Sequence, residues 1–316
     1  MLFFLETTIY LTLIIENFNK VISRNTIFTK INTLKISLSN LELSATINSY
    51  GAELISLKNN FDREYIWEGN PDFWGKHSPI LFPIVGSLRN NCYSYNNITY
   101  HLPRHGFARE MNFDVIEKTD NKVVFSLQQS EKTLENYPFQ FELQISYTLI
   151  NSVLKISFKV INNNKVSMPF SIGAHPAFAL PNDFENYELV FEKSEELVVS
   201  KLENDLISNA TSTLLLENNR LPLNYSYFEN DALIFKTIES KSVTITENEI
   251  PFLKVHYNDF PSLGIWTKTQ APFICIEPWF GYADTTENNG NLEEKEGIQI
   301  LEVNQTFETN YLIEIL

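Results

Sequence analysis

Apolar and polar residues alternate along much of this chain, and this alternation restricts its fold more than any other sequence feature. Between residues 34 and 47, apolar residues take every second position on either side of Ser39–Asn40. The same pattern runs between residues 139 and 160, on either side of Asn151–Ser152. A period of two sends successive side chains to opposite faces of a strand, and a short polar break joins two strands into a hairpin. We therefore expect half-buried antiparallel strands.

Clusters of asparagine separate the apolar runs, as expected for turns that need a left-handed backbone. They are Asn59–Asn60, Asn90–Asn91, Asn96–Asn97, Asn162–Asn164 and Asn218–Asn219. No long stretch has helical periodicity, no repeat recurs at solenoid spacing, and no linker rich in Pro, Gly or Ser divides the chain. The sequence predicts one all-β domain of antiparallel strands over residues 32–316.

The first residues depart from this pattern. Residues 2–15, LFFLETTIYLTLII, are apolar but contain Glu6, and no lysine or arginine precedes them. The stretch is shorter than the roughly 20 residues that span a bilayer, and no small-residue cleavage site follows it. We expect residues 1–31 to form an N-terminal extension outside the β domain, and we expect no association with a membrane.

The chain is acidic, with a formal net charge of -15 at pH 7. A nucleic-acid site needs a concentrated basic face that displaces counterions, so this charge argues against a nucleic-acid partner. The two cysteines, Cys92 and Cys275, lie far apart and lack the spacing of a disulfide framework or a zinc site. We expect reduced thiols, no metal and a cytoplasmic location.

Two segments place a lone ionisable residue among apolar neighbours. His175 lies within SIGAHPAFAL, and Glu277 lies within APFICIEPWF. Burial raises the pKa of a carboxyl toward neutrality, and histidine already titrates near neutral pH, so the two side chains suit proton transfer. The alternative is structural: a buried histidine satisfied by a backbone carbonyl, and a carboxylate satisfied by an arginine. Residue spacing alone does not choose between these alternatives.

Both residues belong to longer motifs. The chain contains, in this order, HSPILFPIVGSLRNNCY (77–93), LPRHGFAR (102–109), SIGAHPAF (171–178) and GIWTKTQAPFICIEPWFGYAD (264–284). With this combination it resembles the aldose 1-epimerase (galactose mutarotase) family over residues 32–316, and particularly the shorter bacterial branch found beside lactose genes. The resemblance implies an antiparallel β-supersandwich and an isomerase that interconverts the α and β anomers of free sugars without a cofactor. It further implies that His175 protonates the ring oxygen while Glu277 removes the proton of the anomeric hydroxyl.

The resemblance also suggests residues that bind the sugar. His105 and Arg109, in HGFAR, are expected to hydrogen-bond sugar hydroxyls or to organise the pocket, although Arg109 could instead pair with a carboxylate. Asp231, in FENDALIFK, corresponds to a sugar-binding aspartate at the start of a strand. Many relatives carry an arginine directly after the glycine of FPIVG, where this chain has Ser87. Arg89 would share a face with Ser87 in a strand, which makes it the candidate replacement.

Other functions remain open at this stage. A hexose-6-phosphate mutarotase would share the acid/base chemistry but needs extra basic residues for the phosphate, and the sequence shows no arginine cluster. A non-catalytic carbohydrate-binding protein would not need an apolar-flanked histidine and glutamate. A glycoside hydrolase generally needs two carboxylates at the scissile bond, and one is supported here. We expect a free aldohexose as the substrate and a monomer or weak homodimer.

Overall fold

The hairpin between residues 139 and 160 has the register that the sequence predicts. The structure is a computed structural model, and it describes residues 33–316. Strand β9 (Phe141–Ile150) pairs with β10 (Val153–Asn162) across a turn in which Asn151 has a φ of 50°. More and less buried residues alternate along both strands, as they do in a sheet that turns one face to the core. The predicted extension, residues 1–31, lies outside the described residues.

The first predicted hairpin also forms, with one difference. Strand β1 (Lys35–Ser39) pairs with β2 (Leu43–Asn48), which pairs in turn with β3 (Glu53–Asn59). Leu41, which the alternation placed in the second strand, lies in the turn and is 95% exposed. The turn is longer than expected because the side chain of Asn40 accepts hydrogen bonds from the backbone N–H groups that follow it.

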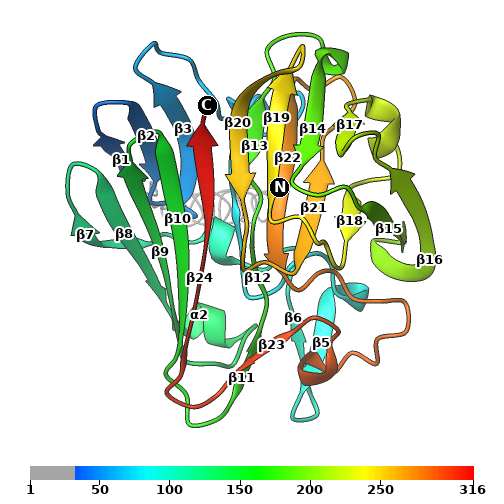
Figure 1. Cartoon of the computed structure of the whole chain (residues 1–316). Helices are drawn as coiled ribbons and strands as arrows, with labels where there is room; N and C mark the ends of the chain where they lie inside the picture. The colour runs from blue at the N-terminus through cyan, green and yellow to red at the C-terminus, as the bar shows by residue number, and fades with distance from the viewer. Residues whose placement is uncertain (1–32) are drawn as a thin grey trace, which may run out of the picture. The chain divides into compact units, whose positions relative to one another are not determined.

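Two large antiparallel sheets dominate the described chain (Figure 1). The nine-stranded sheet has the order β17 (Arg220–Pro222), β14 (Tyr187–Phe191), β19 (Ser242–Glu247), β20 (Ile250–His256), β24 (Thr306–Ile315), β10, β9, β8 (Lys122–Gln128) and β7 (Asp114–Lys118). The eight-stranded sheet has the order β16 (Leu206–Leu215), β15 (Glu196–Glu203), β18 (Leu233–Phe235), β21 (Ser262–Trp266), β22 (Phe273–Phe280), β12 (Ile172–Ala174) and β4 (Ile80–Leu81), with β13 (Ala177–Ala179) also paired to β22.

The remaining elements are small. Strands β1 to β3 form their own sheet, and two further pairs are β11 (Met168–Phe170) with β23 (Gln299–Leu301) and β5 (Cys92–Tyr95) with β6 (Ile98–His101). The helical turns are α2 (Glu131–Leu134), η1 (Arg89–Asn91), η2 (Ala108–Glu110), η3 (Phe184–Asn186), η4 (Tyr225–Phe228) and η5 (Leu292–Glu294). Within residues 33–316, no helix has the length and apolar character needed to cross a membrane.

The two large sheets share one apolar core. Phe158 of β10 and Ile276 of β22 belong to the same cluster of buried side chains. Phe280 of β22 contacts Phe307 of β24 across the sheets, with ring centroids 4.9 Å apart. Two antiparallel sheets that bury their inner faces against each other form a β-sandwich. The all-β fold predicted from the sequence is confirmed.

Several of the asparagine clusters form the predicted turns. Positive φ values occur at Asn90, Asn91, Asn96, Asn97, Asn218 and Asn219. Asn162 has a different role, since its buried amide donates hydrogen bonds to the carbonyls of Val166 and Leu301, at 2.9 and 2.8 Å. This side chain therefore ties the end of β10 to the segment that carries β23.

Candidate active site

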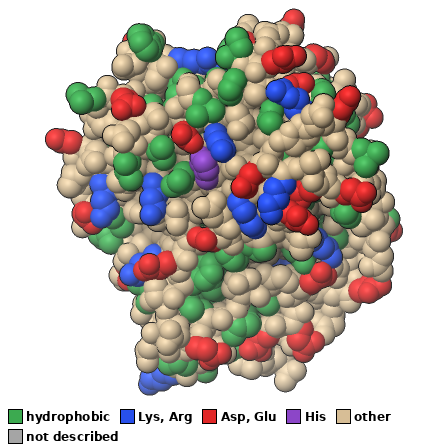
Figure 2. All heavy atoms as spheres, viewed as in Figure 1, with side chains coloured by type: hydrophobic (Ala, Val, Ile, Leu, Met, Phe, Trp, Pro, Cys, Tyr) green, Lys and Arg blue, Asp and Glu red, His purple; other side chains and the backbone are tan. Residues whose placement is uncertain are grey.

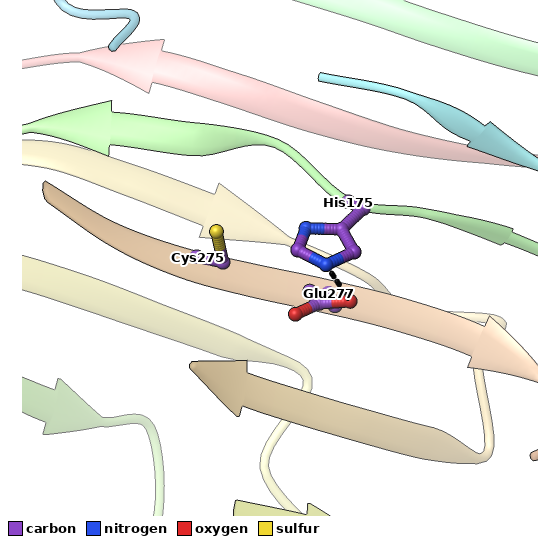
Figure 3. Close-up of side chains that lie close together, drawn as sticks. All are labelled: His175, Cys275 and Glu277. Atoms are coloured by element: carbon purple, nitrogen blue, oxygen red, sulfur yellow. Dashed lines mark ion pairs between the residues drawn. The ribbon is translucent and has the colours of Figure 1, made fainter. Parts of the chain in front are cut away.

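His175 lies at a break between two short strands. Strand β12 ends at Ala174 and β13 begins at Ala177, and both pair with β22. Pro176 has no N–H to donate to a sheet ladder, which accounts for the interruption. The backbone N–H of His175 donates to the carbonyl of Pro79 at 3.1 Å. The break leaves the imidazole lying over β22 (Figure 3).

Glu277 lies in the interior of β22, between apolar residues, on the face that His175 covers (Figure 3). Nε2 of His175 is 3.3 Å from Oε2 of Glu277. Both residues are nearly enclosed, with 8% of His175 and 2% of Glu277 exposed. The structure therefore brings together the two side chains that the sequence identified as an acid/base pair.

Burial dominates the electrostatics of this pair. It lowers the pKa of His175 to about 3 and raises the pKa of Glu277 well above its ordinary value. Two groups this close and this desolvated titrate as a unit. When the pair holds one proton, that proton lies either on the imidazole, next to a carboxylate, or on the carboxyl, next to a neutral imidazole.

Aromatic rings hold the imidazole in place. Trp74 stacks on His175, with ring centroids 4.8 Å apart and planes inclined by 26°. Trp266 and His105 meet the same ring edge-on, at 5.7 and 5.9 Å. An imidazole enclosed on several sides has little rotational freedom, so its nitrogens keep a fixed direction relative to Glu277.

Two glycines allow Trp279 to lie beside the pair. A Cβ on Gly264, which is opposite Glu277 in the β21–β22 register, would come within 2.3 Å of the Trp279 ring. A Cβ on Gly173 of β12 would come within 2.6 Å of the same ring. Only residues without a side chain leave room for the indole across these strands.

These side chains line a cavity of about 350 Å³, which falls in the range of small-molecule sites. Its walls are formed by Trp74, Gly86, Ser87, Arg104, His105, Arg109, His175, Leu202, Asp205, Asp231, Ala232, Ile234, Trp266, Glu277, Trp279 and Ala283. The cavity thus unites an acid/base pair, aromatic surfaces and charged side chains. Figure 2 shows one face of the molecule, on which basic side chains are interspersed with acidic ones.

His105 is a neutral hydrogen-bond donor to the cavity. Burial lowers its pKa well below the ordinary value, so the ring is uncharged. The N–H of Gly86 donates to Nδ1 at 3.1 Å, and the N–H of His105 returns a bond to the Gly86 carbonyl at 2.9 Å. A neutral imidazole has one acceptor nitrogen, so the proton lies on Nε2. Nε–H of Arg104 also points at Nε2, at 3.3 Å, but a neutral ring accepts at only one of its nitrogens, and the shorter bond from Gly86 assigns the acceptor to Nδ1.

Arg109 and Asp231, which the sequence predicted to bind the sugar, also line the cavity. Arg109 donates from Nη2 to the backbone carbonyl of Arg104 at 2.9 Å. Its Nε is buried and has no hydrogen-bond partner among the described residues. Asp231 has a φ of 92°, and its Oδ1 accepts a hydrogen bond from the N–H of Ala232 at 2.7 Å.

Arg89 does not take the place predicted for it. The expectation assumed a strand through Ser87 and Arg89, but the helical turn η1 begins at Arg89 instead. Its guanidinium donates to the carbonyl of Thr286, and its N–H donates to Oδ2 of Asp284 at 2.9 Å. Ser87 lines the cavity, whereas Arg89 is absent from the described residues that do so.

Among the cavity residues that sequence reasoning overlooked, three have charged or aromatic side chains that bear on the chemistry: Trp74, Arg104 and Asp205. Arg104 directly precedes His105 in the LPRHGFAR motif, and Trp74 lies three residues before His77, where the HSPILFPIVG region begins, so both were within reach of a motif-based search. Asp205 had no such signal, because it lies in the turn between β15 and β16, far from every motif. Only the fold brings this turn to the cavity.

One cluster has the residue types of a metal site. His175, Cys275 and Glu277 each offer one donor atom, and these atoms lie within 4.8 Å of one another (Figure 3). A metal needs the thiolate form of cysteine, however, and burial raises the pKa of Cys275 well above its ordinary value. Cys275 packs among apolar side chains, including Trp67 and Phe273. The donor set therefore fits a metal ion poorly.

An all-β sandwich with a buried histidine–glutamate pair at the wall of a cavity of about 350 Å³ has the features of a class of enzymes that move protons on a small molecule. Comparison with known proteins agrees with this class. The aldose 1-epimerase family model matches residues 34–303. The plasmid protein LacX of Lactococcus lactis subsp. lactis is 36% identical over 298 residues, which cover 90% of this chain and 100% of LacX. The chain belongs to the aldose 1-epimerase family.

Solved structures agree with this assignment. A galactose mutarotase related enzyme from Lactobacillus acidophilus is 33% identical, with a TM-score of 0.85, covering 90% of this chain and 97% of its own. A galactose mutarotase-like protein from Lactobacillus casei ATCC 334 is 31% identical, also with a TM-score of 0.85, covering 90% of this chain and 100% of its own. Membership of this family supports an isomerase of the racemase and epimerase type, with a sugar as its substrate.

Proposed function

We propose that this chain interconverts the α and β anomers of a free aldohexose by acid/base ring opening, without a cofactor. The proposal rests on the pair of His175 and Glu277, an imidazole and a carboxyl 3.3 Å apart at the wall of a cavity of about 350 Å³. In an aldose, the ring oxygen and the anomeric hydroxyl are bonded to the same carbon. The acid and the base that open the ring must therefore lie close together as well.

The reaction conserves every proton. Glu277, as the carboxylate, accepts the proton of the hydroxyl on C1, while the imidazolium of His175 donates its proton to the ring oxygen. The bond between C1 and the ring oxygen breaks, and C1 becomes the aldehyde carbon. Rotation about the bond between C1 and C2 presents the other face of the aldehyde. The C5 hydroxyl then attacks this face, His175 takes the hydroxyl proton back, and the carboxyl of Glu277 returns its proton to the oxygen on C1.

The sugar helps to place the shared proton. Burial favours the form in which both groups are neutral, since each is desolvated. A sugar hydroxyl that donates a hydrogen bond to Glu277 stabilises the carboxylate, and a proton moves to the imidazole in response. The hydroxyl on C1 therefore stabilises the ion pair that is active in catalysis when the substrate fills the cavity.

The other side chains that line the cavity offer contacts to the apolar face and to the hydroxyl groups of a sugar. The rings of Trp74, Trp266 and Trp279 offer apolar surfaces to the C–H face of a pyranose. The protonated Nε2 of His105 donates to a sugar oxygen, and the guanidinium of Arg109, which lines the cavity, donates to another. These contacts orient the ring so that its anomeric end faces Glu277.

Anomer exchange measured by proton NMR tests the proposal. Samples of glucose, galactose and other free aldoses are examined for exchange between their anomeric signals, with and without the protein. We expect exchange well above the rate in buffer, and we expect Glu277→Gln to abolish the increase. Sugar binding without any increase in exchange would instead identify a carbohydrate-binding protein, and would refute the proposed activity.

The proposal extends to the location of the enzyme in the cell, which we expect to be the cytoplasm. Cys92 and Cys275 are both free thiols, which suits the reducing cytoplasm predicted from the sequence. Fractionation of cells that express the full chain tests this location. Recovery of the protein with the membranes or in the medium would contradict it.

A further inference from the structure

The open end of the cavity differs from its buried end. His175 and Glu277 are almost enclosed, whereas 44% of the Arg104 side chain and 65% of the Asp205 side chain are exposed. This inference rests on the proposed function, which places C1 of the sugar against the buried pair. The terminal carbon of the aldohexose, C6, is the carbon farthest from C1 and is then directed toward the open end of the cavity. Substituents on that carbon are therefore recognised by the charges there.

Arg104 is the basic residue at this end, and it has two acidic partners. Its Nη1 lies 3.6 Å from Oδ1 of Asp205, and its Nη2 lies 3.3 Å from Oδ2 of Asp231. The three residues come from separate segments: the loop before Gly106, the β15–β16 turn, and the loop before β18. Asp205 is held at its position by a tight turn, in which Asn204 and Asp205 both have positive φ.

The structure also corrects a premise drawn from the sequence. No cluster of arginines was evident along the chain, yet the fold brings Arg104 and Arg109 to the same cavity. Two arginines in one cavity would suit a phosphate ester, which binds guanidinium groups through paired hydrogen bonds. Asp205 and Asp231 line the same cavity and oppose this charge. The balance between these groups therefore decides which sugars enter.

We propose that Asp205 is a specificity-determining residue, which together with Asp231 neutralises Arg104 so that the cavity takes uncharged aldoses and rejects their terminal phosphate esters. Both ends of the Arg104 guanidinium face a carboxylate, so a phosphate must displace one of them. It must also approach two negative charges at short range, where repulsion is strong. A neutral hydroxyl meets neither obstacle, because it can donate to a carboxylate and accept from the guanidinium at once.

The test compares Asp205→Asn with a matched control. Glu203→Gln removes the same charge from an exposed residue at the end of β15 that does not line the cavity. The ratio of kcat/KM for glucose 6-phosphate to that for glucose is measured by anomer exchange. We expect Asp205→Asn to raise this ratio about tenfold and Glu203→Gln to leave it unchanged within about twofold. The gain should disappear when Arg104→Gln is added, and it should shrink as salt rises from about 20 to about 500 mM.

The outcomes separate this inference from the proposed function. A wild-type preference for the phosphate, an unchanged ratio in Asp205→Asn, or an equal rise in Glu203→Gln would each overturn the role of Asp205 while leaving the isomerase activity intact. Failure to exchange any sugar would refute the proposed function alone. In that case the affinities of the two sugars, measured by calorimetry on wild type and Asp205→Asn, still decide whether Asp205 discriminates against phosphate.

Discussion

Two buried pairs of ionisable side chains lie in this fold at nearly the same separation, and they differ in what surrounds them. Lys295 and Asp284 are 3.4 Å apart with side chains 1% and 2% exposed, and His175 and Glu277 are 3.3 Å apart with side chains 10% and 2% exposed. Distance and burial therefore do not distinguish the pairs. The distinction lies in the groups that complete the hydrogen bonding of each charge.

The lysine–aspartate pair is enclosed by polar partners. Oδ2 of Asp284 accepts from the N–H of Arg89 at 2.9 Å, and Oδ1 accepts from the amide of Asn288 at 3.1 Å. Lys295 also donates to the carbonyl of Tyr282. Burial lowers the pKa of Lys295, while Asp284 opposes that shift. Because these hydrogen bonds satisfy both charged groups, the pair holds the loop after β22 in place.

The histidine–glutamate pair is flanked by tryptophan rings and opens to the cavity instead. The pKa values of both groups move in the directions that favour their neutral forms. A buried pair with a complete polar shell supports the fold, whereas a pair that lacks one and opens to a cavity has the surroundings of a functional site.

The largest expected effect is on activity. His175→Asn and Glu277→Gln should each reduce anomer exchange by at least about a hundredfold, the usual range for loss of an acid or base. The unfolding free energy should change by less than about 1 kcal/mol in the isosteric Glu277→Gln, and by about 1 to 2 kcal/mol in His175→Asn, which loses the stacking on Trp74. Exchange spectroscopy and denaturant titration of the same samples provide the two measurements.

Another histidine–glutamate pair provides the control for this prediction. His256 of β20 lies 2.7 Å from Glu314 of β24, but both side chains are more exposed and lie outside the cavity. His256→Asn should therefore keep near-native exchange. A normal rate in folded His175→Asn, or a collapse of activity in His256→Asn, would show that the cavity pair has been given the wrong role.

The second effect is on stability, and it concerns the other buried pair. Lys295→Met should lower the free energy of unfolding by about 3 kcal/mol, because it leaves the carboxylate of Asp284 buried without its cation. Lys122→Met is the matched control. Lys122 and Glu117 form an exposed pair at 2.8 Å, and its loss should change stability by less than about 1 kcal/mol. Equal effects of the two substitutions would contradict the structural role of the Lys295–Asp284 pair.

A third effect tests how the strands support the catalytic pair. Gly264→Ala should lower kcat/KM about tenfold and stability by about 1 to 3 kcal/mol, since the new Cβ overlaps the Trp279 ring beside Glu277. Gly75→Ala, whose Cβ would meet Pro71 at an ordinary 3.7 Å, serves as the control. Kinetics and thermal unfolding of both variants give the comparison. A silent Gly264→Ala would show that the position of Trp279 has no bearing on the site.

The sequence predicted the local features of this molecule well. Alternation identified the β9–β10 hairpin and its turn, because strand periodicity and the backbone of Asn151 are local properties. It misplaced Leu41, since the side chain of Asn40 sets the length of that turn. The motifs likewise identified His175 and Glu277, each from its own apolar surroundings.

What the sequence missed depends on contacts between distant segments. Asp205 reaches the cavity because β15 and β18 are neighbours in one sheet, and no local pattern records that neighbour relation. Arg89 was misplaced for a related reason. Its expected strand is replaced by a helical turn whose start is bonded to Asp284, nearly two hundred residues away. Pairings of this kind follow from the fold, not from the residues beside each position.

The smallest expected effect is a flat pH profile, and it tests the shared proton directly. Activity requires that the pair hold exactly one proton, so it falls on the acid side when a second proton binds and on the alkaline side when the last proton leaves. Burial lowers the pKa of His175 to about 3 and raises the pKa of Glu277, so the two limits move apart. We expect kcat/KM to vary by less than about twofold between pH 5 and 8, after subtraction of the buffer rate. An inflection near 6.5, the ordinary pKa of histidine, would show that His175 titrates independently and that the two residues do not share a proton.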